Sequence, residues 1–278
     1  INPVDGSLIC HIAEADRTMV EQAVSSAKKA MKGAWGKTTL SERIAFMHKI
    51  ADGIEARYDD FVAAEIADTG KSYSQVNNID IPRGAANFRN FATMASSQPV
   101  EAWHTHDSEA RDALNYVVNR PVGVVAVISP WNLPLLLLTW KVAPALVMGN
   151  AVIAKPSEET PSTATLLAEV IHDAGLPEGA FNLLHGFGVD SAGQFLTESE
   201  GVDAITFTGE TKTGENIMKA AANGVRSVSF ELGGKNAALV FEDANFEDAV
   251  AGVARSTFTN CGQVCLCTER VYVQRSIF

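Results

Sequence analysis

The first third of the chain repeats apolar residues at a helical period. The segments EQAVSSAKKAM and SERIAFMHKIADGI each place apolar side chains on one side of a helix and polar side chains on the other. We therefore predict helices from Arg17 to about Phe91. From Tyr116 onward the pattern changes, because short apolar runs rich in β-branched residues begin to alternate with helical segments.

Five of these apolar runs predict strands: VGVVAVIS, AVIAK, FNLLHGFG, DAITFTG and SVSFE. The first two are nearly continuous in apolar residues, which is typical of strands buried on both faces. The helix after AVIAK is delimited by Thr160 as its N-cap, Pro161 in its first turn, Gly175 at a left-handed C-cap and Pro177 just beyond. Strands and helices that alternate in this way predict a doubly wound, mostly parallel α/β sheet preceded by helices.

Composition and charge restrict the partners of such a protein. Hydrophobic residues make up 46% of the chain and charged residues 20%, as in soluble globular proteins. The formal charge is −11 and no basic run is interleaved with aromatic residues, which argues against a nucleic-acid partner. The most apolar run, residues 133–148, contains two prolines and Lys141 and is short for a membrane span. We predict that it is a buried helix and that the protein has no membrane partner.

Three of the four cysteines, Cys261, Cys265 and Cys267, fall within seven residues. We predict no metal site, because Cys-x3-Cys-x-Cys has no second ligand cluster and no nearby histidine. Four cysteines in a chain of this length make no disulfide framework, and the N-terminus shows no secretory segment, so we expect a reducing, cytoplasmic location. A thiolate nucleophile and plain buried cysteines both stay open at this point.

Ligands of doubly wound sheets bind beyond the carboxyl ends of the strands, and SPWN, KPSE, GFG, FTGET and ELGG all follow predicted strands. Lys155 and Glu158 of KPSE belong either to a solvated loop or to a ribose site, where a carboxylate would favour NAD over NADP. The turn from Gly209 to Gly214 opens a helix and is either an ordinary turn or a place where N–H groups meet a phosphate. Glu231 is the last residue of a predicted strand, and Leu232 and two glycines follow it. It is either a surface carboxylate or a catalytic acid or base.

The residues that flank the cysteines resemble a known motif. FTNCGQVC, read as F-x-N-x-G-Q-x-C, resembles the cysteine motif of the NAD(P)-dependent aldehyde dehydrogenases. ELGGK resembles the glutamate motif of that family, and SPWN, KPSE and FTGETKTG resemble its cofactor segments in the same order. The resemblance covers essentially the whole chain. It implies a Rossmann-like cofactor domain with N-terminal helices, followed by the start of a second α/β domain that is catalytic.

The resemblance implies a role for each matching residue. Cys265 would attack the aldehyde to form a thiohemiacetal, and Asn132 with the backbone N–H of Cys265 would hold the oxyanion, a type of donor worth about 3 kcal/mol. Hydride transfer to NAD would leave a thioester, and Glu231 would activate the water that hydrolyses it. Cys261 and Cys267 match no role. The implied cofactor-binding residues are Ser129, Trp131, Lys155, Ser157, Glu158, Gly188, Gly193, Phe207, Gly209, Glu210, Thr211, Gly214, Leu232 and Gly233.

Longer segments resemble one branch of the family, the 2-hydroxymuconic semialdehyde dehydrogenases: DIPRGAANFR, SPWNLPLLLLTWK, HGFGVDSAG and CGQVCLCTER. The branch implies an aldehyde substrate with a carboxylate at its other end, in aromatic meta-cleavage catabolism, and Arg83 as the residue that binds this carboxylate. Alternatively, Arg83 pairs with an acid on the helix surface. The other substrates that stay open are 2-aminomuconic semialdehyde, betaine aldehyde and a broad range of aldehydes. Glu210 departs from the family pattern, which often has serine there.

Residues 1–231 are expected to form the helices and the cofactor domain, with 101–120 partly an oligomerisation segment, and 232–278 an incomplete catalytic domain. The chain opens at Ile1 without a methionine and stops at Phe278 in mid-pattern. We therefore expect a piece of a longer polypeptide that forms a homo-oligomer. Little turnover is expected from residues 1–278 alone, and a non-catalytic protein that keeps the dehydrogenase fold is the alternative class.

Overall fold

The computed structural model describes residues 1–107 and 111–278, and its centre is a five-stranded parallel sheet. The strands are β3 (Val124–Ile128), β4 (Ala151–Lys155), β5 (Phe181–Leu183), β6 (Ala204–Thr208) and β7 (Ser227–Glu231), in the order β5-β4-β3-β6-β7. All five predicted strands are therefore confirmed. β3 and β4 are buried along their whole length, as their continuous apolar runs indicate.

The register of the parallel pairs aligns the carboxyl ends of the strands. Ile128 at the end of β3 pairs with Lys155 of β4 and with Phe207 of β6, and Thr208 pairs with Glu231 of β7. The segments SPWN, KPSE, GET and LGG consequently all leave from one edge of the sheet. This is the edge at which doubly wound sheets bind their ligands.

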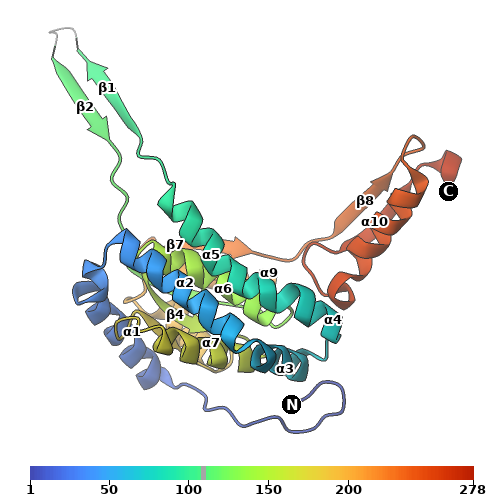
Figure 1. The fold of residues 1–278 in the computed structure, drawn as a ribbon, viewed down its shortest axis with the longest axis horizontal. Coiled ribbons are helices and arrows are strands. Elements are labelled where there is room, and N and C mark those ends of the chain that lie inside the picture. The colour runs from blue at the N-terminus through green and yellow to red at the C-terminus, as the bar shows by residue number, and fades with distance from the viewer. Residues whose placement is uncertain (108–110) are drawn as a thin grey trace.

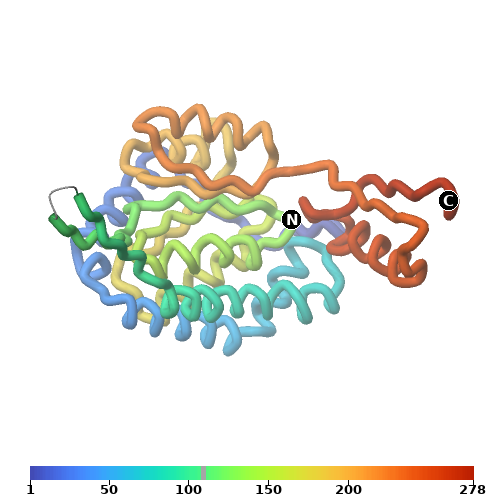
Figure 2. The backbone as a smooth tube through the Cα atoms, turned by 90° about the horizontal axis from the view of Figure 1, so that it is seen from above, coloured from blue at the N-terminus to red at the C-terminus, as the bar shows by residue number. Residues whose placement is uncertain are grey.

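Helices cover both faces of the sheet, which confirms the doubly wound α/β class. On one face lie α6 (Pro134–Val147) and α7 (Ser162–Asp173), with α2 (Leu40–Ala56), α3 (Tyr58–Thr69) and α5 (Ile81–Ser96) outside them. The other face carries α1 (Arg17–Lys32), α8 (Ala192–Glu198) and α9 (Thr211–Ala222), and Figure 2 shows α9 and α5 on opposite sides of the sheet. The apolar run 133–148 is the buried helix α6, and none of the described helices combines the length and hydropathy needed to cross a membrane.

The start of α7 differs from the prediction. The helix begins at Ser162, with Pro161 rather than Thr160 at the N-cap position. The capping acceptor comes from α3, because Asp68 accepts hydrogen bonds from the backbone N–H of Ser162 (2.8 Å) and from its hydroxyl (2.9 Å). A carboxylate from a distant part of the chain thus takes the place of the local threonine. At the other end, Gly175 is left-handed as predicted, with a φ of 81°.

Two parts of the chain project from this body (Figure 1). The antiparallel strands β1 (Ala102–His106) and β2 (Asp112–Tyr116) form an arm. At another side, β8 (Asn236–Val240), α10 (Phe246–Phe258) and β9 (Thr268–Val273) form a separate unit, in which β8 and β9 pair in parallel. The domain boundary at residue 231 and the oligomerisation role of residues 101–120 stay predictions.

Three charged side chains are buried together between α3 and the start of α5. Glu65 of α3, Lys71 and Asp80 have side chains at most 2% exposed, and we refer to them as the buried triad. The Lys71 ammonium lies 2.8 Å from Asp80 Oδ2 and 3.5 Å from Glu65 Oε1. Burial raises the pKa of Glu65 to about 7, against the opposing effect of Lys71 and with the help of Asp80.

We expect the stability of the fold to follow the protonation of Glu65. Its pKa rises from 4.5 to about 7 on folding, so the folded state binds the proton more tightly, and this contribution is lost as the pH rises from 4.5 to 7. The Glu65→Gln variant has no such proton. Its free energy of unfolding, relative to that of the wild type, should increase by about 3 kcal/mol across this window. Urea unfolding followed by circular dichroism measures the two pH profiles, and parallel profiles would contradict the prediction.

Candidate active site

The cysteine motif forms a tight loop between α10 and β9. Asn260, Cys261 and Gly262 all have positive φ, of 53°, 58° and 74°, so the chain turns sharply after α10. Cys267 is buried, with its sulfur 3.5 Å from the carbonyl oxygen of Thr259, whereas Cys261 is exposed and Cys265 is half-buried. The cysteines of the chain are free thiols. Among the described residues, no group of three or more His, Cys, Asp or Glu could hold a metal ion.

Two asparagines connect this loop to the sheet. Asn132 of SPWN donates its side-chain N–H to the carbonyl of Gln263 (2.6 Å), and Asn260 donates its own to the carbonyl of Asn132 (3.0 Å). The predicted oxyanion donor therefore lies against the loop that carries Cys265, with its amide N–H bound to a neighbouring carbonyl. Its Oδ1 atom is buried and accepts no hydrogen bond from any described residue. The oxyanion role itself stays a prediction.

The segment after Glu231 returns to the same loop. Glu231 is exposed at the end of β7. Asn236, at the start of β8, donates hydrogen bonds to the carbonyl oxygens of Cys265 (2.5 Å) and Cys267 (3.2 Å). The glutamate motif and the cysteine motif are thus joined through a residue that the sequence reasoning missed. One feature of the sequence could have indicated Asn236. It is an amide side chain at the start of a strand, directly after a glycine pair and a lysine.

Lys141 is a second residue that the sequence reasoning did not assign to the site. It lies on α6 with its ammonium 3.0 Å from Thr206 Oγ1 of β6. Burial lowers the pKa of Lys141, and the negative charge of Glu231 raises it. The sequence feature that could have indicated Lys141 is that it is a single cation in an apolar run. A buried ammonium needs a polar partner, so such a lysine is expected to contact one. Lys141 thus interacts electrostatically with the predicted base.

The KPSE loop brings Lys155 and Glu158 into contact at the end of β4. The buried Lys155 ammonium donates to the carbonyl of Pro156 (2.8 Å) and lies 3.3 Å from Glu158 Oε2. Burial lowers the pKa of Lys155, whereas Glu158 raises it. Ser157 accepts a hydrogen bond from the backbone N–H of Glu159 (3.3 Å), which orders the loop. The two predicted ribose contacts therefore lie together at the carboxyl edge.

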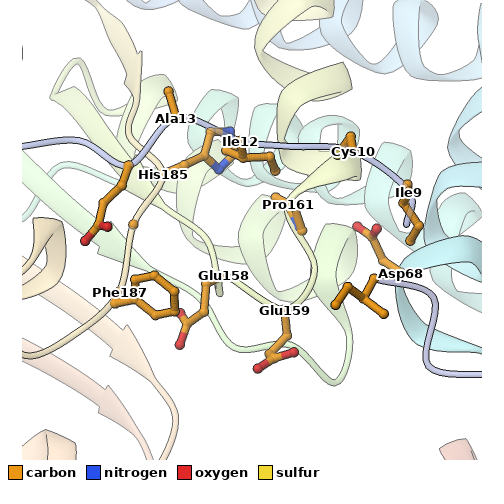
Figure 3. Close-up of a pocket in the computed structure, with 13 residues that line it drawn as sticks. Ile9, Cys10, Ile12, Ala13, Asp68, Glu158, Glu159, Pro161, His185 and Phe187 are labelled. Atoms are coloured by element: carbon orange, nitrogen blue, oxygen red, sulfur yellow. The ribbon is translucent and has the colours of Figure 1, made fainter. Parts of the chain in front are cut away.

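Glu158 also lines a pocket of about 190 Å³. Figure 3 shows the N-terminal segment with Ile12 and Ala13 passing over this pocket, and Glu158 and Phe187 side by side at another part of its wall. His185 is a further lining residue that the sequence reasoning missed. Burial lowers the pKa of His185, and the charge of Lys155 adds to this effect. The pocket has polar groups and an apolar wall next to the predicted ribose contacts.

Two of the predicted cofactor glycines pack tightly at the carboxyl edge. A Cβ atom at Gly209 would lie 2.5 Å from the ring of Phe207, and one at Gly214 would lie 2.9 Å from the Leu232 side chain. These contacts keep the turn after β6 compact. The absence of a side chain also leaves the backbone of this turn close to the space at the strand ends.

Two buried hydroxyls that have no hydrogen-bond partner among the described residues lie at the strand ends near this turn. The hydroxyls of Ser129 and Thr208, at the ends of β3 and β6, are buried and make no hydrogen bond within the described part of the chain. α9 begins at Thr211, directly after the exposed Glu210, whose side chain makes no capping hydrogen bond there. The first-turn N–H groups of a helix suit a phosphate. These residues therefore fit a dinucleotide.

The remaining predicted cofactor residues lie on segments that leave the carboxyl edge. Gly193, at the start of α8, donates its backbone N–H to the carbonyl of Phe187 (2.9 Å), which orders the loop with Gly188. Trp131 is 47% exposed, and Gly233 is exposed with open space where a Cβ atom would be. Their contacts with a cofactor stay predictions.

Arg83 lies exposed in the first turn of α5. Within the described ranges, no carboxylate pairs with its guanidinium, and no hydrogen bond joins it to Asn132 or to the cysteine loop. Both views of the chain place the start of α5 beside the unit that carries this loop (Figures 1 and 2). Arg83 is thus a cation on the same side of the molecule as the predicted nucleophile.

A doubly wound parallel sheet with a glycine turn at its carboxyl edge is the architecture typical of dinucleotide-binding α/β domains. The chain belongs to the aldehyde dehydrogenase family, whose model matches residues 1–278. The family prediction is therefore confirmed.

Several curated relatives of the chain are muconic semialdehyde dehydrogenases. The chain is 58% identical to the 2-hydroxymuconic semialdehyde dehydrogenase of Pseudomonas sp. (strain CF600) and 56% identical to the 2-aminomuconic 6-semialdehyde dehydrogenase of Pseudomonas sp., over 278 residues. It is 40% identical to the human 2-aminomuconic semialdehyde dehydrogenase over 280 aligned positions. These alignments cover 100% of the chain but 56–57% of each relative. The chain thus spans little more than half the length of the relatives it matches.

Solved structures agree with the fold. The structure of PnpE in complex with nicotinamide adenine dinucleotide superposes with a TM-score of 0.93 at 40% identity, covering 100% of this chain and 56% of PnpE. The NAD+ complex of an aldehyde dehydrogenase from Bacillus cereus gives a TM-score of 0.93 at 33% identity, covering 99% of this chain and 55% of that enzyme.

We expect the cysteines of the native loop to differ in their access to alkylating reagents. Cys265 is half-buried, whereas Cys267 is buried. Iodoacetamide should modify Cys265 in the native protein and leave Cys267 intact until urea is added. Peptide mass spectrometry measures both sites, with the exposed Cys10 as an internal control. Equal modification of Cys265 and Cys267 without urea would contradict the observed packing.

Proposed function

We propose that this chain is the cofactor-binding and nucleophile-bearing part of an NAD-dependent aldehyde dehydrogenase that oxidises a muconic semialdehyde to its dicarboxylate. One observation carries the proposal: Asn132 and the loop of Cys265 are joined by two hydrogen bonds, although they are remote in the sequence. This contact brings an amide donor against the loop that carries a partly accessible thiol. The relatives named as 2-hydroxymuconic and 2-aminomuconic semialdehyde dehydrogenases support the substrate class.

The proposed chemistry begins at the sulfur of Cys265. Its thiolate attacks the aldehyde carbon, and the Asn132 amide exchanges its bond to the Gln263 carbonyl for one to the developing oxyanion. Bound NAD supplies the acceptor for the hydride that leaves the thiohemiacetal carbon. Glu231 then takes a proton from water, which attacks the resulting thioester and releases the carboxylic acid and the thiolate.

The choice of NAD over NADP rests on Glu158. Its carboxylate lies 3.3 Å from the Lys155 ammonium at the end of β4. A carboxylate in this position accepts hydrogen bonds from ribose hydroxyls and repels a 2′-phosphate. The N-terminus of α9, after Gly209, would take the pyrophosphate. Glu210 departs from the family pattern, which often has serine there, so backbone N–H groups would carry more of this contact.

We also propose that the enzyme is a homo-oligomer whose subunits meet along the β1–β2 arm. The arm projects from the body of the chain (Figure 1). It carries large apolar side chains that are more than half exposed, namely Trp103 at 52%, Leu114 at 61% and Tyr116 at 63%. Burial of such side chains against a second subunit would supply the hydrophobic stabilisation that the arm lacks alone.

Replacement of the nucleophile is the first test of the mechanism. In the full-length enzyme that carries this chain, Cys265→Ala should lower kcat more than about a thousandfold, because the covalent route is lost. Cys261→Ala replaces an exposed cysteine of the same loop that has no assigned role, and this variant should retain activity. NADH formation measured by absorbance, with NAD titration as a folding control, compares the two variants. Comparable loss in both would reject Cys265 as the nucleophile.

Replacement of Arg83 tests the substrate class. Loss of a charge-assisted contact to the distal carboxylate should raise KM for 2-hydroxymuconic semialdehyde roughly ten- to a hundredfold in the full-length Arg83→Ala variant. KM for an uncharged aliphatic aldehyde should stay within about twofold. Arg89→Ala is the matched control, since Arg89 lies on the same helix and pairs with Asp52 and Glu55 on the surface. Equal effects of Arg83→Ala on both aldehydes would reject the proposed substrate.

A further inference from the structure

The buried triad has no part in the proposed mechanism, yet it lies between the two helix starts that present Arg83 and Asn132. Removing two carboxylates and an ammonium from water is costly, and apolar residues of similar volume would fill the same space. Asp80 pairs with Lys71 at 2.8 Å, and the contact of Lys71 with Glu65 is longer, at 3.5 Å. A role in specifying geometry would account for the presence of these charges in the interior.

Glu65 attaches to the start of α6. Leu133, at the N-cap position of this helix, makes no side-chain capping hydrogen bond, and Pro134 has no backbone N–H. The next N–H, that of Leu135, donates to Glu65 Oε2 at 3.4 Å. A carboxylate at a helix N-terminus is also favoured by the helix dipole. Glu65 thus takes the place of a cap for the helix that begins directly after the SPWN motif and its Asn132.

Asp80 attaches to the start of α5. One oxygen accepts from Lys71, and the other accepts from the side chain of Gln75 at 3.0 Å. These bonds close the π-helical turn Val76–Asp80, from which α5 continues with Arg83 in its first turn. Short π-helical turns are rare in globular proteins and often occur at functional sites. Asp80 therefore ties the π-helical turn that precedes α5 to Lys71 and Gln75.

The two helix starts also touch each other. Gly84, which follows Arg83, leaves room for the side chain of Leu135, because a Cβ atom there would come within 2.7 Å of it. Farther along, Asn87 of α5 donates to the carbonyl of Leu136 (3.1 Å). Lys71 lies between the carboxylates that hold these two starts. A change in the triad would consequently shift one start relative to the other.

We propose that Glu65, Lys71 and Asp80 are positioning residues that fix the distance between Arg83 and Asn132, and so select aldehydes whose carboxylate lies at the far end of the molecule. The proposal rests on the proposed function, because it takes Arg83 as the carboxylate-binding residue and Asn132 as the residue at the aldehyde end. The triad itself touches neither substrate nor cofactor. A substrate held at only one end would be insensitive to this distance, whereas a substrate held at both ends would depend on it.

Asp80→Asn in the full-length enzyme is the primary test. The variant keeps the shape of the side chain and weakens its hold on Lys71. We expect KM for 2-hydroxymuconic semialdehyde to rise about tenfold, because a displaced Arg83 loses part of its charge-assisted contact with the carboxylate. KM and kcat for an uncharged aliphatic aldehyde should stay within about twofold. Asp52→Asn is the control, because it removes a surface ion pair between α2 and Arg89 of α5. It should change KM for neither aldehyde. Equal losses with both aldehydes, or no change with either, would overturn the proposal.

A second, milder variant tests the proposal in case Asp80→Asn does not fold. Gln75→Ala removes one hydrogen bond to Asp80 and leaves the ion pair with Lys71 intact. It should raise KM for the semialdehyde about two- to threefold, in the same direction as Asp80→Asn, without affecting the uncharged aldehyde. A loss of thermal stability with unchanged selectivity would make the triad a purely structural element and overturn the proposal.

A double-mutant comparison separates this proposal from the function on which it rests. In the Arg83→Ala background, Asp80→Asn should add little to KM for the semialdehyde, because the far contact is already lost. Independent, multiplicative effects would overturn the positioning role. If Arg83→Ala alone left selectivity unchanged, the proposed substrate class would fail. If Arg83→Ala changed selectivity and Asp80→Asn did not, only the positioning role would fail.

Discussion

Parallel pairing of β3 with β4 and β6 is the constraint on which the rest of the molecule depends. The register puts Ile128 beside both Lys155 and Phe207, so that three chain segments with different sequences leave the sheet at one edge. The strands themselves contribute almost only apolar side chains to the core. Their chemistry is in the residues that follow them. A slip in this register would separate the KPSE loop from the glycine turn, even if every local segment kept its structure.

The cysteine loop is attached to this edge by a different kind of interaction. α10 has no buried residue among those described, and most of the loop is exposed. The loop therefore depends on the amides of Asn132, Asn260 and Asn236, which bind backbone carbonyls. Amide–carbonyl contacts of this kind contribute only about 1 kcal/mol each, but they are strongly directional. Apolar packing forms the sheet, and directional bonds orient the nucleophile.

The sequence predicts the parts of the structure that depend on local patterns. Continuous β-branched runs identified β3 and β4, and motif order identified the family. The N-cap of α7 was predicted wrongly because its acceptor, Asp68, comes from a different helix. Lys141 and Asn236 were missed for the same reason, since their partners are close only after folding. The apolar and polar pattern of one segment carries no information about which remote carboxylate or carbonyl will face it.

α6 shows what these remote contacts accomplish. A helix that is apolar on nearly all sides has no single face that must point inward, so packing alone leaves its rotation about its own axis poorly defined. Here the Lys141 ammonium binds Thr206, and the backbone N–H of Leu135 binds Glu65. These two bonds lie at different positions around and along α6. Together they fix the rotation of the helix about its own axis. Asn132 lies two residues before this helix, so these interior contacts place its backbone, and the bond to the Gln263 carbonyl orients its amide.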